Sequence, residues 1–400
     1  MVRLSREIAT FIVVECGAVE MLRRLSDPFW FQAFGCVLGF DWHSSGVTTT
    51  VCGAVKEAMG GIDRELGFYA AGGKGRRSRQ TPAEVLAACE AIGRDAAPLV
   101  YASRMAAKVD SAAVQDGYQL YHHAFFFTAS GDWCVVQQGM SDRTSDARRY
   151  HGLSPNVTSF VDEPHDAVCC DLRPGGLNLV AHESAPARTA CAELAGQPPD
   201  VTLRAVERIP ELALPARHAL LPGFDVSGRH LQSILLETYE RPPADFEALL
   251  AREGVGPRTV RALALASELI FGAPASTRDP ARFAFAHGGK DGTPYPVDRR
   301  VYDTTIDVLG KAINRAGVDR SEKVRAFRRL SAFAAAAPSP DRLAGVGTHQ
   351  VQPGQRPLHL CLRQWHFAHV IARHCDLLEK VLPVVAGEPE PRFDARNRLE

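Results

Sequence analysis

The sequence predicts an α+β fold, with a mixed N-terminal domain that carries antiparallel hairpins and an all-helical module after it. Two segments rich in aromatic and β-branched residues, 121–128 and 133–140, flank the turn sequence Ala-Ser-Gly-Asp, which is typical of a β-hairpin. A second pair of short apolar segments, 167–172 and 177–181, flanks Arg-Pro-Gly-Gly and predicts another hairpin. From about residue 200 the apolar residues recur at helical spacing instead.

Helix signals are clear at the N-terminus and at several points further on. Residues 1–60 are expected to be mostly helical. Thr81, with Glu84 three residues later, has the pattern of a capping box at a helix start. Asp245 precedes an apolar stripe at helical spacing and predicts an N-cap.

Length and composition indicate more than one domain. The 400 residues, of which 46% are hydrophobic, suffice for two domains with cores of their own. Changes in pattern near residues 200 and 335 divide the chain into three parts. We expect an α+β domain over residues 1–200, a helical domain over 201–335, and a linker with a C-terminal helical tail over 336–400.

Charge and cysteine content exclude several classes of protein. The formal net charge is zero, so any contact with nucleic acid must come from local patches rather than from bulk charge. The ten cysteines form no Cys-x-x-Cys pair, which favours reduced thiols and a cytoplasmic protein. The apolar segment at residues 9–14 is followed by Glu15 and is too short for a signal peptide or a membrane span. We therefore expect no membrane partner, and the oligomeric state stays open.

A glycine hinge lies between two helical segments, in the sequence Arg-Glu-Gly-Val-Gly-Pro-Arg-Thr at residues 252–259. Glycine lets a ligand approach the backbone because no Cβ stands in the way, and Pro257 suits the first position of a helix. The free N–H groups and the dipole of a helix start favour an anion. We expect a nucleic-acid phosphate at this hinge, held by Gly254, Gly256, Arg258 and Thr259. An ordinary helix–helix turn with a capping glycine is the alternative.

The hinge resembles the helix-hairpin-helix motif of DNA repair proteins. Six residues fall in register with that motif: Leu250, Gly254, Val255, Gly256, Thr259 and Ala262. Over residues 250–306 the sequence also resembles the corresponding module of DNA glycosylases, whose Pro-Val-Asp motif is matched by residues 296–298.

This resemblance implies a catalytic role for Asp298, although a helix N-cap would suit the position equally. Arg258 stands where bifunctional glycosylases carry a Schiff-base lysine, and arginine cannot lose its proton to act as a nucleophile. Lys290, in an insert before the motif, is expected to hold a phosphate or to serve as an amine nucleophile.

A basic loop offers a second surface for the same ligand. Lys74, Arg76, Arg77 and Arg79 stand in Gly-Gly-Lys-Gly-Arg-Arg-Ser-Arg without an acidic neighbour. One hairpin contacts one or two phosphates, which gives a log–log salt slope of only about −1 to −2, so a second surface is needed. A solvated surface turn is the alternative. Glycine and lysine also stand together in two loops, at Lys74 and at Lys290, but no Ser or Thr follows the lysine in either. Neither loop is therefore a P-loop, and no nucleotide cofactor is expected.

Acidic and imidazole side chains gather in two stretches of the first domain, around residues 41–43 and 108–123. Carboxylates that hold a hard cation beside a lysine are what metal-dependent phosphodiester hydrolysis needs. We expect four catalytic residues here: Asp41, Lys108, Asp110 and Asp116. We expect a manganese or magnesium ion bound by Asp41, His43, Asp110, Asp116 and His122. Gln137 or Gln138, which are consecutive on one strand, is expected to share a face with this cluster. The alternative is that these residues are dispersed through the core and surface.

Several long segments are similar to the uncharacterised prokaryotic family named domain of unknown function 763. They are "LRRLSDPFWFQAFGCVLGFDWHSSGVTTTV", "DGYQLYHH", "VVQQGM", "FAHGGKDGTPYPVDR" and "YDTTI". The resemblance covers residues 10–335 and implies no activity. Similar proteins begin somewhat earlier, so we expect Met1 to lie inside the first helix, at a shortened start.

The sequence therefore predicts a cytoplasmic protein that binds and processes DNA, with metal-dependent phosphodiester cleavage in the first domain and the hinge as anchor. Three alternatives remain. One is a base-excision enzyme that uses Asp298, and another is a non-enzymatic adaptor for DNA or RNA. The third is an enzyme that does not act on nucleic acid, whose helical module is structural.

Overall fold

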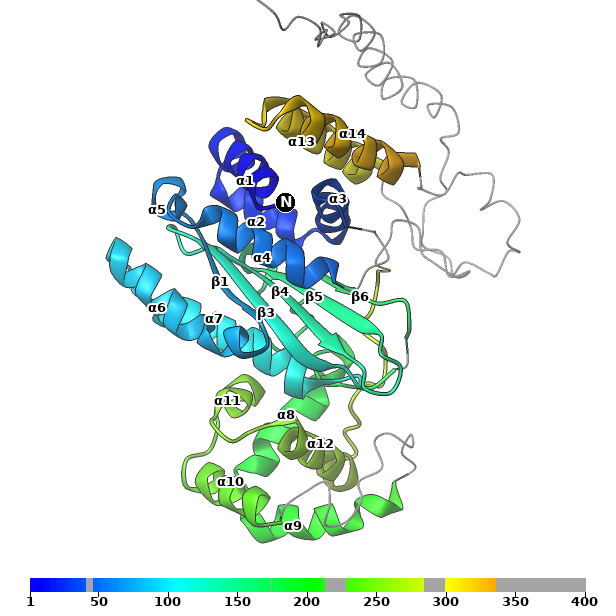
Figure 1. The fold of residues 1–400 in the computed structure, drawn as a ribbon. Coiled ribbons are helices and arrows are strands. Elements are labelled where there is room, and N and C mark those ends of the chain that lie inside the picture. Colours follow the sequence, from blue (N-terminus) through cyan, green and yellow to red (C-terminus); the bar gives the residue numbers. More distant parts are fainter. Residues whose placement is uncertain (41–45, 174, 213–227, 284–298, 336–400) are drawn as a thin grey trace, which may run out of the picture. The chain divides into compact units, whose positions relative to one another are not determined.

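The computed structural model describes residues 1–40, 46–173, 175–212, 228–283 and 299–335, all of them within one compact unit. The predicted α+β class is confirmed, since helices cover both faces of an antiparallel sheet (Figure 1).

The five-stranded sheet has the order β1-β3-β4-β5-β6, and every neighbouring pair is antiparallel. Its strands are β1 (Phe68–Lys74), β3 (Gln119–Thr128), β4 (Trp133–Met140), β5 (Ala147–Leu153) and β6 (Ala167–Cys169). The hairpin predicted at residues 121–128 and 133–140 is confirmed as β3 and β4. Successive side chains of a strand face opposite sides, so Phe125 and Phe127 face one layer of helices while Phe126 faces the other.

The second predicted hairpin, at residues 167–172 and 177–181, is wrong. Strand β6 pairs with β5, and β7 (Leu177–Asn178) pairs with β2 (Val114–Gln115) in a separate two-stranded sheet. The connection between β6 and β7 is held from outside, because the Asp279 carboxylate accepts a hydrogen bond from Gly175 N. Turn residues between two apolar segments indicated a reversal here. Instead β6 pairs with the strand before it, and β7 pairs with β2, which lies far earlier in the sequence.

Helices from two parts of the chain cover the central sheet. The N-terminal helices α2 and α4 pack on one face, and α6 and α7 pack on the other (Figure 1). The N-terminal set is α1 (Val2–Cys16), α2 (Ala18–Ser26), α3 (Pro28–Leu38), α4 (Val47–Met59) and α5 (Asp63–Leu66). The opposite set is the 3-10 helix η1 (Gly75–Gln80), α6 (Thr81–Ile92), α7 (Ala97–Lys108) and the π-helical turn η2 (Val109–Ala113).

The capping box predicted at Thr81 is wrong, although the helix does begin there. The Thr81 hydroxyl donates to Ser78 O at 2.7 Å and caps no N–H of α6. Glu84 instead accepts from Gly72 N of β1 at 2.6 Å and from the Lys56 ammonium of α4. The sequence pattern assigned the Glu84 carboxylate to the local helix cap. In the structure it binds the buried Gly72 N–H and the Lys56 ammonium, which lie on neighbouring elements.

Five further helices form a second packed region. They are α8 (Ala185–Ala195), α9 (Pro199–Arg208), α10 (Gly228–Glu240), α11 (Phe246–Ala251) and α12 (Pro257–Phe271), with the short 3-10 helices η4 (His182–Ser184) and η5 (Ile209–Glu211) packed against them. A further 3-10 helix, η3 (Ser154–Asn156), follows β5. The predicted cap at Asp245 is confirmed, because its carboxylate accepts from Ala248 N at 2.7 Å. Pro257 occupies the first turn of α12, as predicted.

The last two described helices, α13 (Arg299–Arg315) and α14 (Arg320–Ala335), contact the N-terminal helices α1 and α3. One apolar cluster joins residues of α7, η2 and α8 to residues of α10, α11 and α12, so elements on both sides of residue 200 share a core. The domain boundaries near residues 200 and 335 stay predictions.

Within the described ranges, no helix is both long and apolar enough to cross a membrane. The cysteines of the same ranges are all free thiols, and most are buried.

Candidate functional site

Strand β3 sends its two consecutive histidines to opposite faces of the sheet. His123 lies beside Gln137 of β4 and meets Ser103 of α7. His122 lies between Lys74 of β1 and Gln138 of β4, on the other face. Of the two consecutive glutamines, Gln137 therefore shares a face with His123.

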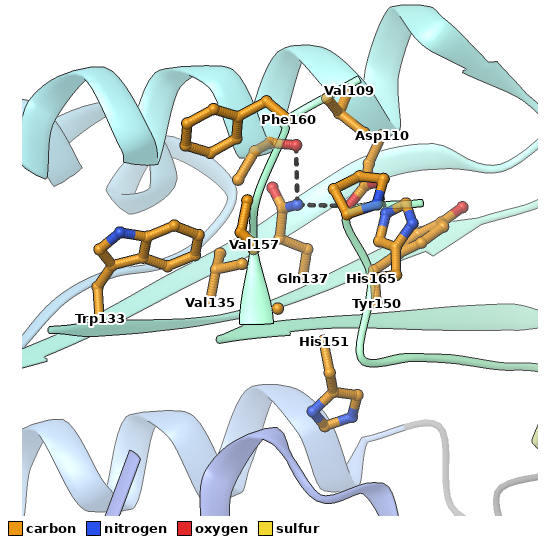
Figure 2. A pocket seen from close by; sticks show the side chains of 13 residues that line it. Val109, Asp110, Trp133, Val135, Gln137, Tyr150, His151, Val157, Phe160 and His165 are labelled. Carbon is orange, nitrogen blue, oxygen red and sulfur yellow. Dashed lines mark hydrogen bonds and ion pairs between the residues drawn. The ribbon is translucent and has the colours of Figure 1, made fainter. Parts of the chain in front are cut away.

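A line of hydrogen bonds runs from Ser103 to His165 through three buried side chains. Ser103 Oγ lies 2.9 Å from His123 Nε2, and His123 Nδ1 lies 2.7 Å from Gln137 Oε1. Gln137 Nε2 donates to Asp110 Oδ2 at 2.5 Å, and Asp110 Oδ1 lies 2.5 Å from His165 Nε2 (Figure 2). We call these five residues the hydrogen-bond relay. They come from α7, η2, two strands and the loop before β6, so the tertiary fold assembles them.

The relay determines the tautomer of His123. Gln137 Nε2 faces two acceptors, Ala106 O at 3.1 Å and the Asp110 carboxylate, so Gln137 Oε1 is the atom that faces His123. An amide oxygen only accepts, so His123 Nδ1 carries the hydrogen. The lone pair of a neutral imidazole is then on Nε2, and the Ser103 hydroxyl donates to it.

The electrostatics of the two relay histidines differ. Burial lowers the pKa of His123 below its usual value, although its hydrogen bond with Gln137 and the charge of Asp110 act in the opposite direction. Burial also opposes the charge of His165, but the carboxylate of Asp110 raises the pKa of this histidine above its usual value. At neutral pH, His123 is thus a neutral base in contact with a serine hydroxyl, the arrangement that activates a nucleophile.

A small cavity of about 20 Å³ lies at the inner end of the relay, with room for one water molecule. Asp110, Gln137, Tyr150 and His165 supply its polar wall, and Trp133, Val135, Val157 and Phe160 supply much of its apolar wall (Figure 2). A cavity of this size admits nothing larger than water, whereas the Ser103 end of the relay opens into a pocket of about 290 Å³.

Asp116 belongs to a separate buried network. Arg148 Nη1 donates to Asp116 Oδ2 at 2.8 Å and Arg148 Nη2 donates to Asp279 Oδ2 at 2.9 Å. The Tyr150 hydroxyl also donates to Asp116 Oδ2 at 2.8 Å. Burial alone would lower the pKa of Arg148, but Asp116, Tyr150 and Asp279 raise its pKa above the usual value. Arg148 therefore stays charged and joins the central sheet to the segment that follows α12.

Lys108 lies at the end of α7 and holds the hinge. Its ammonium donates to Arg252 O and to Val255 O, each at 2.7 Å. Burial lowers the pKa of Lys108 below its usual value. Further along the same segment, Gln115 donates to Pro257 O at 2.8 Å and accepts from Arg261 Nε. The sequence placed Lys108 among catalytic carboxylates, whereas its two hydrogen bonds go to backbone carbonyls of the hinge.

The hinge itself has the backbone that its glycines predict. Gly254 has φ of 78°, in the left-handed region that favours glycine, and Gly256 is the N-cap of α12. Among the described residues, no side chain caps the first turn of α12. Arg258 is exposed, whereas the Thr259 side chain is buried, so Thr259 can meet a ligand only through its backbone N–H.

The basic loop forms the end of β1 and the 3-10 helix η1, and we call residues 74–79 the basic turn. All four cations, Lys74, Arg76, Arg77 and Arg79, are exposed. The Lys74 ammonium also lies over the Tyr121 ring, 5.7 Å from its centroid.

A pocket of about 290 Å³ opens between the basic turn, α7 and β3. Arg79 and Arg104 line it together with Ser103 and His123 of the relay, and Ala107 and Ser111 extend its wall. None of the described residues that line this pocket is acidic. The pocket therefore combines the outer end of the relay with two cationic side chains.

The residues predicted to hold a metal have different surroundings. Asp110 is in the relay, Asp116 faces Arg148, and His122 lies on the opposite face of the sheet from His123. Among the described residues, no group of three or more His, Cys, Asp or Glu side chains is arranged to hold a metal ion. Asp41, His43, Lys290 and Asp298 lie outside the described residues. The metal site and the role of Asp298 stay predictions.

His122 provides a prediction about acid stability. The side chain is 1% exposed, and neither ring nitrogen has a hydrogen-bond partner among the described residues. Burial, with smaller effects of His123 and Lys74, lowers its pKa from 6.5 to about 3. The unfolded chain then binds the proton more readily, so stability falls as the pH drops from about 6.5 towards 3, by up to about 1.4 kcal/mol per pH unit. His122→Phe is expected to lose less stability than the wild type between about pH 6 and pH 4, measured by urea unfolding.

The exposed His182 offers a matched control, because His182→Phe is expected to follow the wild-type pH dependence. Parallel loss of stability in His122→Phe and the wild type would contradict the prediction.

Sequence reasoning missed Ser103, His165, Arg104 and Arg148. Ser103 had one signal, because it is a polar residue within the apolar face of a helix, next to Ala102 and near Leu99 and Ala106. His165 lies in a loop without periodicity, and nothing near it in sequence indicates that it reaches Asp110. Arg148 lies on a strand that is buried along its whole length, where an arginine is unexpected without knowledge of its partners.

Comparison with known proteins gives one result. The family described as "Protein of unknown function (DUF763)" matches residues 1–297. No curated protein and no solved structure matches the chain.

Proposed function

The chain belongs to the family of proteins of unknown function DUF763, and from the geometry around α7 we propose that it binds the phosphate backbone of a nucleic acid, in the first place DNA. The hinge and the basic turn would be the two contact surfaces. The observation that carries the proposal is the pair of hydrogen bonds from Lys108 to the hinge carbonyls.

These two bonds orient the hinge. With the carbonyl groups of Arg252 and Val255 engaged by a half-buried ammonium, the turn is held in one conformation before any ligand arrives. The first N–H groups of α12 have no capping side chain, and Arg258 is exposed beside them. A phosphate at this point would meet backbone donors, the positive end of the helix dipole and one guanidinium.

Helix α7 connects the hinge to the basic turn. Arg104 and Ala107 of α7 line the same pocket as Arg79 of the basic turn, while the next residue, Lys108, holds the hinge. A backbone that follows α7 would therefore meet both surfaces. Their exposed cations explain how a protein of zero net charge could bind a polyanion.

Single- and double-stranded DNA carrying a fluorophore would test the proposal by anisotropy across a salt series. Arg258→Ala is expected to weaken binding several-fold at low salt and to reduce the log–log salt slope by about 1, because one phosphate contact is lost. The double variant Arg76→Ala, Arg77→Ala is expected to reduce the slope by about 2. Both effects should be the same for unrelated DNA sequences, since phosphate contacts read no bases.

Arg204→Ala serves as the control, because Arg204 is an exposed arginine of α9 that lines neither surface. Absence of binding at low salt, or equal affinities of Arg258→Ala and Arg204→Ala, would refute the proposal. The same samples, incubated with Mn²⁺ or Mg²⁺ and separately with EDTA, test the metal-dependent cleavage that the sequence predicts. Release of a base from damaged duplex tests the base-excision alternative.

A further inference from the structure

The pocket beside the basic turn contains a serine and a histidine in the arrangement of a nucleophile and its base. Ser103 and His123 both line the pocket, and their side chains are 2.9 Å apart. A serine within a helix commonly returns its hydroxyl hydrogen bond to a carbonyl of the preceding turn. Ser103 donates instead across to β3, so its proton already faces the atom that would receive it.

His123 is held for this task by the rest of the relay. Gln137 fixes the tautomer with the lone pair on Nε2, and Gln137 is itself fixed by Asp110 and by Ala106 O. The geometry repeats the logic of a catalytic triad, in which a third group orients the base. Here the group bonded to the His123 imidazole is the neutral amide of Gln137, and the Asp110 carboxylate is bonded to that amide in turn.

The charge of the pocket indicates the class of substrate. Arg79 and Arg104 are the charged side chains of its lining, and no described lining residue is acidic. Guanidinium groups suit the non-bridging oxygens of a phosphate, which they can bind through two parallel hydrogen bonds. Arg79 also belongs to the basic turn, so a backbone held there would bring its phosphates to the pocket mouth.

We propose that this pocket is a phosphodiester-cleaving site, with Ser103 as nucleophile, His123 as general base and then acid, and Arg79 and Arg104 as the phosphate-binding groups. For DNA as the physiological substrate, the proposal rests on the nucleic-acid binding proposed above. The chemistry of the dyad does not depend on that binding.

The first step transfers the phosphoryl group to the enzyme. Ser103 Oγ attacks phosphorus, its proton passes to His123 Nε2, and the bond between phosphorus and the leaving oxygen breaks. The leaving alkoxide takes the proton from His123 Nε2, so that a phosphoseryl diester and a free hydroxyl result. In the second step water attacks phosphorus and gives its proton to His123 Nε2, the bond between phosphorus and Ser103 Oγ breaks, and His123 passes the proton to Ser103 Oγ. The products are a phosphate monoester and the original enzyme. Arg79 and Arg104 stabilise the charge on the non-bridging oxygens throughout.

A small chromogenic diester, bis(p-nitrophenyl) phosphate, tests the chemistry without requiring DNA binding. We expect the wild-type protein to release p-nitrophenol in the presence of EDTA. Ser103→Ala is expected to lose turnover by about 100-fold or more, the range typical of a lost nucleophile or base. Ser267→Ala is the matched control, because Ser267 is also a buried helical serine with a single partner, Cys191 Sγ. Equal turnover in the two variants would overturn the proposal.

Covalent capture provides a second measurement that does not depend on the Ser103 variant being folded. Diisopropyl fluorophosphate should phosphorylate Ser103 with loss of fluoride, and peptide mass spectrometry should locate the adduct. Labelling is expected to be lost in His123→Asn, which keeps the serine and removes the base. Failure of the folded wild-type protein to form an adduct at Ser103 would overturn the proposal. So would hydrolysis of p-nitrophenyl acetate without hydrolysis of the diester, since the site would then act on carboxylic esters.

The two proposals can fail separately. DNA binding without diester turnover or labelling would leave the proposed function intact and refute the catalytic site. Diester turnover and serine labelling without DNA binding at low salt would refute the proposed function. The substrate of the catalytic site would then be a smaller phosphodiester.

Discussion

Replacing Arg148 with methionine is expected to lower the free energy of unfolding by about 3–5 kcal/mol, the cost of removing one partner from a buried ion pair. The Arg148 side chain is 0% exposed, and the Asp116 and Asp279 side chains facing it are 1% and 7% exposed. Methionine fills part of the volume but leaves two carboxylates without their shared cation. Tyr118, whose ring lies 4.4 Å from the guanidinium, loses a cation–π contact as well. Urea unfolding followed by far-UV circular dichroism measures the change.

The control for this substitution is Arg278→Met. Arg278 also bridges two carboxylates, those of Glu163 and Glu183, but its side chain is 56% exposed. Water solvates the glutamates after the change, so we expect a loss below about 1 kcal/mol. A loss of similar size in both variants would show that burial is not the cause and would contradict the prediction.

Gly72→Ala is expected to destabilise the protein by about 2–5 kcal/mol, from a strained backbone and an overpacked site together. Gly72 has φ of 87°, and a Cβ built there would lie 2.2 Å from His123 O and 2.6 Å from Thr81 Oγ1. The first of these atoms is backbone and cannot rotate away. Strand β1 must then separate from β3 next to the relay, so thermal unfolding and amide exchange of β3 should both report the change.

Gly53→Ala tests whether the effect arises from the site rather than from alanine itself. Gly53 lies within α4, and a Cβ there would have no atom within 4 Å outside the backbone of its own helix and its chain neighbours. This change is expected to stabilise the protein by about 0.5–1 kcal/mol, since glycine is the poorer helix former. Unchanged stability and exchange in Gly72→Ala would refute the clash.

Local signals allowed correct prediction of much of the fold. The hairpin of β3 and β4, the Asp245 cap and the Pro257 helix start each depend on residues within a few positions of one another. The hairpin of β6 and β7 was mispredicted because β6 pairs with the strand before it and β7 pairs with β2, far earlier in the sequence. Glu84 was mispredicted for the same reason, since its carboxylate binds Gly72 and Lys56.

The candidate site was predictable only in part. The many polar residues at positions 108–123 correctly indicated a segment that contributes to the candidate site. The strand pattern indicated that either Gln137 or Gln138 would share a face with it. Which residues converge depends on side-chain direction at particular positions. The π-helical turn η2 directs Asp110 to Gln137 while Lys108, two residues earlier, faces the hinge. The contribution of His165 comes from a loop more than fifty residues away, whose path no local pattern indicates.

Helices α13 and α14 have a consequence for biosynthesis. Arg3 donates to Gly317 O across a separation of 314 residues, and Gly317 N donates to Glu7 across 310 residues. At the usual translation rate of about 5–20 residues per second, α1 leaves the ribosome roughly 15–60 s before the helix that covers it is made. During that interval an apolar helical surface stays open at the front of the nascent chain, where chaperones or premature self-association compete for it. The yield of folded full-length protein should therefore rise when expression is cooled or chaperones are supplied, even though the protein has a large core.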